Sequence, residues 1–215
     1  MTPLPFTDDQ FFAVFAAYNR AFIVVAVALW LVSVGVLIGA FRNPERLSRV
    51  LSLFLAALWL WNAVAYHAIF FTSINPAAWL FAGLFALQAL LLLFAAMGRN
   101  VEYFSAGGLR ETTGVALVVY ALAYPFLTIA SGHTYPATPT FGVPCPTAIL
   151  TIGVLLTARA GPPTRLALIP MLWAFIGGSA AILLGVVTDY VLLAAGLLLT
   201  LLLLRRVWLV SRRPF

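Results

Sequence analysis

Long apolar runs, separated by short polar or basic segments, make up most of this chain. A helix that spans a bilayer needs about 20 consecutive apolar residues, within a range of about 17 to 25. Runs that meet this length or come close to it cover residues 21–41, 50–71, 77–97, 114–131, 166–186 and 189–206. Each of these runs predicts a transmembrane helix.

A further run, residues 147–160, is shorter. Its 14 residues would rise about 21 Å as a helix, whereas the hydrocarbon core of a bilayer is about 30 Å thick. The run is either less tilted than its neighbours or begins below the membrane surface. In the second case Pro144, Cys145 and Pro146 descend into the protein as a re-entrant cap, which requires surrounding protein or a wet cavity.

The residues before the first run predict a separate helix over residues 7–20. Thr7 and Gln10 have the spacing of a capping box. Asp8 and Asp9 fall in the first turn, where the helix dipole favours anions. We interpret this segment as a short interfacial helix; the alternative is that it extends the first transmembrane helix.

The predicted fold is therefore an all-α, polytopic membrane bundle of seven transmembrane helices, preceded by the interfacial helix, in one domain over residues 1–215. The composition agrees, because 64% of the residues are hydrophobic and 8% are charged. That leaves too little polar surface to cover a soluble domain. The lipid bilayer is the predicted environment and partner of the chain.

The basic residues, all twelve of them arginines, predict the orientation. Eleven follow the first, third, fifth and seventh runs: Arg42, Arg46, Arg49, Arg99, Arg110, Arg159, Arg165, Arg205, Arg206, Arg212 and Arg213. Cytoplasmic loops carry the excess of positive charge, so we expect an inner-membrane protein with its N-terminus outside and its C-terminus in the cytoplasm. This placement explains the net charge of +6 without a nucleic-acid partner. The lack of lysine excludes a retinal Schiff base.

Residues that could carry chemistry gather on the opposite, outer side. Residues 132–146 are neither apolar nor basic and hold four prolines, so they predict an outer or re-entrant loop. Within this loop we interpret Pro144, Cys145 and Pro146 as structural. The prolines would begin the next helix, and Cys145 would be a small buried side chain.

Polar side chains on the predicted helices lead toward this loop. Tyr120, Tyr124 and Thr128 recur every four residues and form one stripe. His67 is an ionisable group within a span, which makes it a functional candidate because keeping it there costs free energy; the alternative is that lipid headgroups or a carbonyl satisfy it. The candidate substrate-binding residues are Tyr66, His67, Tyr120, Tyr124, Thr128, His133 and Asp189.

The chemistry of such a site stays open at this point. His67, His133 and Cys145 are residue types that bind a borderline divalent metal, but the chain has no HxxxH, HExxH or CxxC spacing. A Cys145 nucleophile with His133 as its base is an alternative, although no cationic neighbour in the sequence would activate the thiol. No other cofactor is evident and no catalytic residue is identified.

Three short motifs carry a resemblance to a known family. They are INPAAW at residues 74–79, GHTYP at residues 132–136 and FGVPCPT at residues 141–147. With them the chain resembles an uncharacterised family of small bacterial multi-pass membrane proteins that share an FGxPCPT loop, some of them labelled permeases. The resemblance implies a bacterial inner-membrane protein with a transport role, and it assigns no role to any residue.

Three functions from different classes follow. The first is a permease for a small solute or ion, in which the outer polar residues form the entry site; only Asp189 could then couple transport to an ion. The second is a membrane-embedded enzyme that acts at the outer leaflet. The third is an accessory structural subunit of a membrane complex, so an oligomer or a partner subunit is also open. We favour the permease.

Overall fold

The computed structural model describes residues 4–98 and 101–211, and these form a bundle of seven α-helices. Three short irregular segments adjoin two of them: the π-helix η1 (Asn62–Phe70) and the 3₁₀ turn η2 (Phe71–Ser73) continue α2, and the 3₁₀ turn η3 (Val187–Asp189) precedes α7. The α-helices are α1 (Asp8–Arg42), α2 (Pro44–Trp61), α3 (Ala78–Gly98), α4 (Gly108–Ala130), α5 (Pro144–Leu156), α6 (Thr164–Leu183) and α7 (Tyr190–Ser211).

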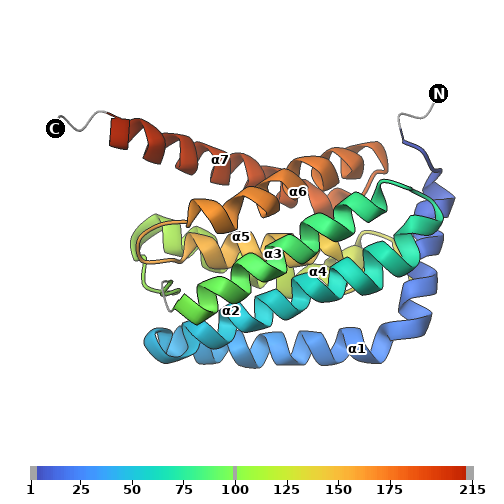
Figure 1. The fold of residues 1–215 in the computed structure, drawn as a ribbon. Coiled ribbons are helices and arrows are strands. Elements are labelled where there is room, and N and C mark those ends of the chain that lie inside the picture. The colour runs from blue at the N-terminus through green and yellow to red at the C-terminus, as the bar shows by residue number, and fades with distance from the viewer. Residues whose placement is uncertain (1–3, 99–100, 212–215) are drawn as a thin grey trace.

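Consecutive helices run in opposite directions, so their connections collect at the two ends of the bundle (Figure 1). One end holds the α1–α2, α3–α4 and α5–α6 connections, with Arg42, Arg110 and Arg159, and the end of α7 with Arg205; we call it the arginine end. The other holds the loop of residues 131–143 between α4 and α5, and we call it the loop end.

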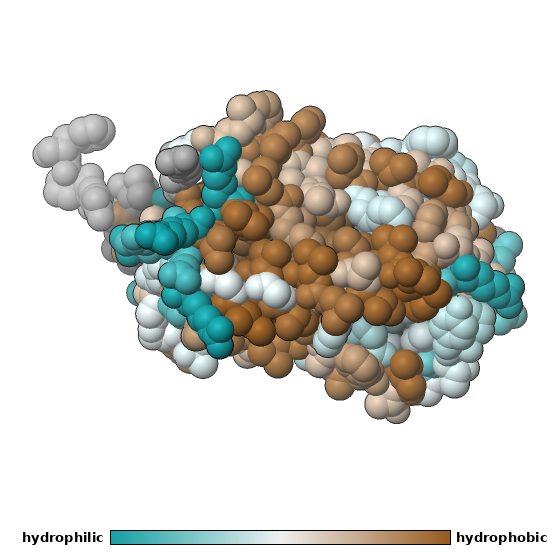
Figure 2. All heavy atoms as spheres, turned by 90° about the horizontal axis from the view of Figure 1, so that it is seen from below, coloured by the Kyte–Doolittle hydropathy of each residue, from teal (hydrophilic) through white to brown (hydrophobic). Residues whose placement is uncertain are grey.

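The outer surface of the bundle is apolar. Among the described residues, six helical stretches are long and apolar enough to cross a bilayer. Their outward side chains include Val24 and Leu201, which are 78% and 64% exposed. Figure 2 shows a brown hydrophobic band between hydrophilic ends. A soluble monomer rarely exposes an apolar surface of this extent, so the structure indicates a membrane protein.

Helix α1 contains both the segment predicted to lie in the interface and the first predicted span. The capping box is confirmed, because the Thr7 hydroxyl accepts from the Gln10 N–H and the Gln10 side chain accepts from the Thr7 N–H. Phe22 has non-helical dihedrals, φ −131° and ψ 17°. At this kink the chain turns, and the part before it lies across the loop end at a steep angle to the rest of α1 (Figure 1).

Helix α5 begins earlier than the predicted apolar run at residue 147. Pro144, Cys145 and Pro146 were assigned to the loop of residues 132–146, but they form the first turn of α5, and the expectation that the prolines begin this helix is confirmed. The reason is that proline in the first turn lacks only an N–H that has no acceptor there. The helix also ends at Leu156 rather than at residue 160.

Helix α5 is short because protein encloses it. All its residues except Cys145 are buried, and it contacts α2, α4, α6 and α7. Its 13 residues rise about 20 Å. The backbones of α5 and α4 pack directly against each other at Gly153. A Cβ atom added to Gly153 would lie only 2.8 Å from the Gly114 carbonyl oxygen, so a side chain does not fit there. Such small residues let two helices approach closely within a membrane.

The other helices differ from the predicted runs mainly at their polar ends. Helix α2 starts at Pro44 and α4 at Gly108, each six residues before the predicted apolar run. Their first turns carry Glu45 and Glu111, which suit a helix N-terminus although not a hydrocarbon core. A search for apolar runs therefore could not include these turns.

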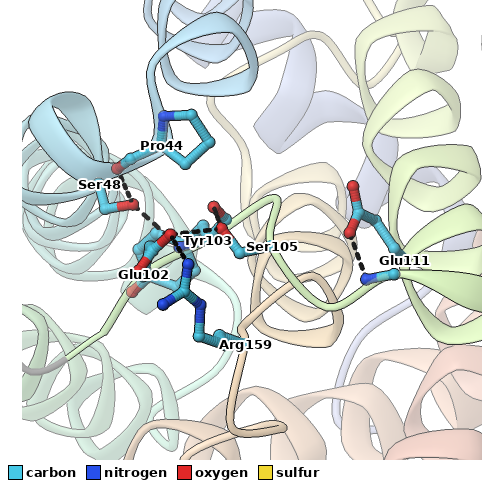
Figure 3. Close-up of polar contacts among 8 residues, drawn as sticks. Pro44, Ser48, Glu102, Tyr103, Ser105, Glu111 and Arg159 are labelled. Atoms are coloured by element: carbon cyan, nitrogen blue, oxygen red, sulfur yellow. Dashed lines mark hydrogen bonds and ion pairs between the residues drawn. The ribbon is translucent and has the colours of Figure 1, made fainter.

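Local hydrogen bonds hold the α3–α4 connection at the arginine end (Figure 3). The Tyr103 N–H donates to the Ser48 hydroxyl at 2.9 Å, and that hydroxyl donates to the Pro44 carbonyl at 2.6 Å. Arg159 forms an ion pair with Glu102 at 2.8 Å, and the Ser105 hydroxyl donates to the same carboxylate oxygen. These contacts tie the connection to α2 and to the α5–α6 connection.

Candidate functional site

A cavity of about 270 Å³ lies at the loop end. The kinked N-terminal part of α1 forms one wall, and η1, η2, the first turn of α5, the C-terminal part of α6 and η3 contribute to the others. The walls are mostly aromatic or aliphatic, with contributions from Phe6, Phe11, Phe15, Phe71, Phe81, Ile176, Leu183 and Leu184. A cavity of this kind suits an apolar ligand.

One carboxyl group lies among these apolar walls. Asp189 lines the cavity and is only 5% exposed. The Tyr124 hydroxyl donates to its Oδ1 at 2.6 Å, and the Cys145 thiol also interacts with this carboxyl group. The three residues come from η3, α4 and the first turn of α5. Packing therefore joins segments that are far apart in the sequence.

Tyr66 and Trp173 also contribute polar groups to the cavity lining, as do Asn75 and Ser179. The Tyr66 ring packs between Phe15 and Phe71, with ring centroids 5.6 Å and 5.7 Å away. The Trp173 indole interacts with the Cys145 sulfur, but within the described part of the chain its Nε1 makes no hydrogen bond of acceptable geometry. This N–H is therefore a buried donor without an acceptor.

The π-helix η1 explains how Tyr66 and His67 are placed. Its wider turn brings residues five apart onto one face, so Asn62 and His67 both point inward and both are fully buried. Asn62 donates to the Thr147 hydroxyl of α5 at 3.1 Å. Such π-segments often occur at functional sites. The apolar periodicity of residues 50–71 does not distinguish a π-turn from an α-helix.

His67 lies behind the cavity wall. Its ring is enclosed by Phe81, Phe85 and Trp173, with centroid distances of 5.8 Å, 4.6 Å and 5.2 Å. Neither ring nitrogen has a hydrogen-bond partner among the described residues. His67 itself does not line the cavity, but its neighbours Trp173 and Phe81 do.

His133 lies in the loop and stacks on Phe12, with ring centroids 4.8 Å apart. It does not line the cavity, so of the candidates His67, His133 and Asp189 only Asp189 is a lining residue. Within residues 4–98 and 101–211, no group of three or more histidine, cysteine, aspartate or glutamate side chains could hold a metal ion. The structure thus separates the three predicted metal ligands His67, His133 and Cys145.

The predicted stripe on α4 divides into one cavity residue and two structural residues. Tyr124 faces Asp189, as described. The Tyr120 hydroxyl donates to the Thr188 carbonyl at 2.8 Å, and the Thr128 hydroxyl contacts the Pro125 and Pro139 carbonyls at 2.9 Å and 3.1 Å. Of the seven predicted binding residues, Tyr66, Tyr124 and Asp189 line the cavity, whereas His67, Tyr120, Thr128 and His133 do not.

Asn19 was not among the predicted site residues, yet it anchors the loop beside the cavity. It is fully buried. Its Nδ2 donates to the Pro136 and Thr138 carbonyls, both at 2.7 Å, and its Oδ1 accepts from the Thr140 hydroxyl at 2.8 Å. The one signal for it in the sequence was a polar residue that interrupts an apolar stretch.

Comparison with known proteins identifies the family. The chain belongs to a family of unknown function, DUF6064, whose model matches residues 8–213. The expected membership of an uncharacterised family is therefore confirmed, and the description of this family assigns it no activity. No curated protein and no solved structure matches the chain.

Proposed function

We propose that this membrane protein binds a small, largely apolar molecule that carries a hydrogen-bond donor, such as a protonated amine, in the loop-end cavity. Binding would be the recognition step of a permease. The observation that carries the proposal is the Asp189 carboxyl group in the wall of a largely apolar cavity.

The shape and chemistry of the cavity define the ligand class. A buried carboxyl group costs free energy unless donors surround it, and Tyr124 supplies one donor to one of its oxygens. A donor on the ligand would supply another. The aromatic walls, with Phe11, Phe15 and Phe71, accommodate an apolar body and attract a cation through their ring faces. A volume of about 270 Å³ admits only a small molecule.

A transport role requires a second conformation. The recesses at the arginine end share no lining residue with the cavity, and the buried helix α5 lies between the two ends. A solute would therefore cross only if the helices rearranged, as in alternating access. The kink at Phe22 and the π-helix η1 are irregular elements beside the cavity where such a change could begin.

The proposed orientation places the arginine end in the cytoplasm and the loop end outside, in a bacterial inner membrane. The arginines of the α1–α2, α3–α4 and α5–α6 connections and of the end of α7 support it. A reporter fused after residue 215 that is active only in the periplasm should then stay inactive. An active reporter would show that the C-terminus lies outside and would refute the proposed orientation.

The two other functions have less support. An enzyme that used Cys145 with His133 as its base would need this histidine beside the thiol, and neither histidine lines the cavity. An accessory subunit would use its polar side chains only to hold helices together, as Tyr120 and Thr128 do. It would not need a cavity with a carboxyl group, so ligand binding separates it from the permease.

The test is a thermal-shift measurement on the full chain in detergent. Phenethylamine and benzylamine are compared with the uncharged analogues 2-phenylethanol and ethylbenzene. A ligand at one hundred times its Kd should stabilise the protein by about 2.7 kcal/mol, and the amines should do so at lower concentrations than the analogues. Stabilising amines are then tested for uptake into proteoliposomes.

The matched variants are Asp189→Asn in the cavity and Asp9→Asn, which makes the same change at an exposed position of the same end. Asp189→Asn should weaken amine binding at least tenfold, and Asp9→Asn should leave it unchanged. Equal binding to both variants, or no stabilisation by any of the probes, would refute the proposed site. Binding without uptake would support the binding site but contradict the transport role.

A further inference from the structure

We propose that a basic recess at the arginine end binds the phosphate headgroup of an anionic phospholipid. This site is separate from the loop-end cavity and does not depend on its function. The recess has a volume of about 430 Å³. Its basic residues are Arg110 of α4 and Arg205 and Arg206 of α7, and Gly161, Leu202 and Leu209 also line it.

Hydrogen bonds to the α5–α6 connection position two of the three guanidinium groups. Arg110 donates through Nη2 to the Ala158 and Arg159 carbonyls at 2.8 Å and 3.1 Å. Arg206 donates through Nη1 to the Pro162 carbonyl at 3.2 Å. A guanidinium group has five N–H donors, so both groups retain donors for a ligand. The two side chains approach the connection from different helices and so define a fixed site.

Gly161 makes this arrangement sterically possible. It has a φ of +86°, and a Cβ atom built on it would lie 2.8 Å from Nη1 of Arg110. A larger residue would be strained at this φ and would also displace the guanidinium group. The connection is thus shaped to admit Arg110.

The charge in the recess is unbalanced. None of its described lining residues is acidic. By contrast, Arg159 at the same end has Glu102 as its ion-pair partner (Figure 3). Three cations that share one recess repel each other, and a phosphate oxyanion would offset this repulsion. Arginine also binds phosphate through two parallel hydrogen bonds, which a lysine cannot do.

The apolar residues beside the recess favour a lipid over a soluble phosphate. Leu202 and Leu209 line it, and Leu201 and Leu204 are 64% and 60% exposed on the same helix. Helix α7 is one of the stretches that could cross a bilayer, so acyl chains could extend along it from the headgroup. Basic recesses between transmembrane helices are known to bind anionic headgroups on the cytoplasmic side.

Native mass spectrometry of the detergent-solubilised full chain tests the proposal. Phosphatidylglycerol and phosphatidylcholine with identical acyl chains are added at equal concentrations, and the bound fraction of each is measured. We expect phosphatidylglycerol to bind at least tenfold more tightly. Equal binding of the two lipids would overturn the proposal.

The decisive variant is Arg205→Glu. Arg205 is exposed and has no hydrogen bond or ion pair within the described part of the chain, so its replacement should leave the fold intact. It should weaken phosphatidylglycerol binding at least fivefold. The matched control is Arg46→Glu, the same change at an exposed arginine of α2 at the same end, and it should leave binding unchanged. Equal weakening by both would mean diffuse surface attraction and no defined site.

A second experiment tests inorganic phosphate as a competing ligand. If the site takes lipid, phosphate at 10 mM should neither displace phosphatidylglycerol nor raise the melting temperature of lipid-free protein. Displacement together with stabilisation of the wild type but not of Arg205→Glu would identify a soluble-anion site and overturn the lipid assignment.

Discussion

The two ends of the bundle use polar residues in different ways. At the loop end, polar groups such as Asn19 and Asp189 are buried, and their partners are distant in the sequence. At the arginine end most charged groups are exposed, and Glu102 and Arg159 pair across two adjacent connections. The loop end therefore depends on packing of the whole bundle, whereas the arginine end depends more on solvent and lipid. Changes of the same kind should cost more free energy of unfolding at the loop end.

The largest effect is expected for Asn19→Ala. The substitution leaves the Pro136 and Thr138 carbonyls and the Thr140 hydroxyl without their partner. Each unsatisfied buried group costs about 1–3 kcal/mol, so the free energy of unfolding should fall by about 3 kcal/mol. At about 2–4 °C per kcal/mol, the melting temperature in detergent should fall by about 6–12 °C.

Asn43→Ala is the matched control for this variant. Asn43 is an exposed asparagine at the arginine end, and its side chain makes no capping hydrogen bond. Its replacement should change the melting temperature by less than about 2 °C. Cleavage by a protease within residues 131–143 should accelerate only in Asn19→Ala. Similar melting temperatures for the two variants would contradict the comparison of the ends.

Two buried tyrosines allow a second comparison. Tyr124 donates to the Asp189 carboxyl group at 2.6 Å, and Tyr103 shares a bond of 3.0 Å with the Ser52 hydroxyl. Burial raises the pKa of Tyr103 to about 12, so this residue stays neutral at physiological pH. A bond to a carboxylate contributes about 1.5–3 kcal/mol, and a neutral bond about 0.5–1.5 kcal/mol.

Tyr124→Phe should therefore lower the free energy of unfolding by about 1 kcal/mol more than Tyr103→Phe. Both variants keep the ring and remove only the hydroxyl group, so each is a control for the other. Denaturation monitored by tryptophan fluorescence measures the difference. A larger loss in Tyr103→Phe would place the stronger polar contact at the arginine end.

The smallest effect is expected for Glu102→Gln. The substitution removes the ion pair with Arg159, whose side chain is 65% exposed. Exposed pairs contribute about 0–1 kcal/mol, so the melting temperature should fall by no more than about 4 °C. The shift should shrink further as salt rises from 50 mM to 500 mM, because salt screens exposed charges. Glu45→Gln, at an exposed position of the same end, controls for the change in net charge.

The sequence by itself determined the helical membrane bundle, the approximate apolar segments and the capping box at Thr7. These features depend on local chemistry: apolar length, the identity of a cap residue and the composition of each run. The same logic assigned the arginines to one end. It also singled out Tyr66, Tyr124 and Asp189, because polar groups in apolar runs are few. Three short motifs, and not this logic, carried the resemblance to an uncharacterised family, and the family match agrees with it.

Only the tertiary structure decided which polar residues meet. His67 and Asn62 turn inward because η1 is a π-helix, and the sequence pattern does not distinguish hydrogen bonds between residues five apart from those between residues four apart. Thr128 was expected in a binding stripe, but it bonds to the carbonyl of Pro139. Whether a polar side chain lines a cavity or satisfies a backbone group depends on which segments pack against it. The packing around α5 fixed that outcome here, and no local pattern records it.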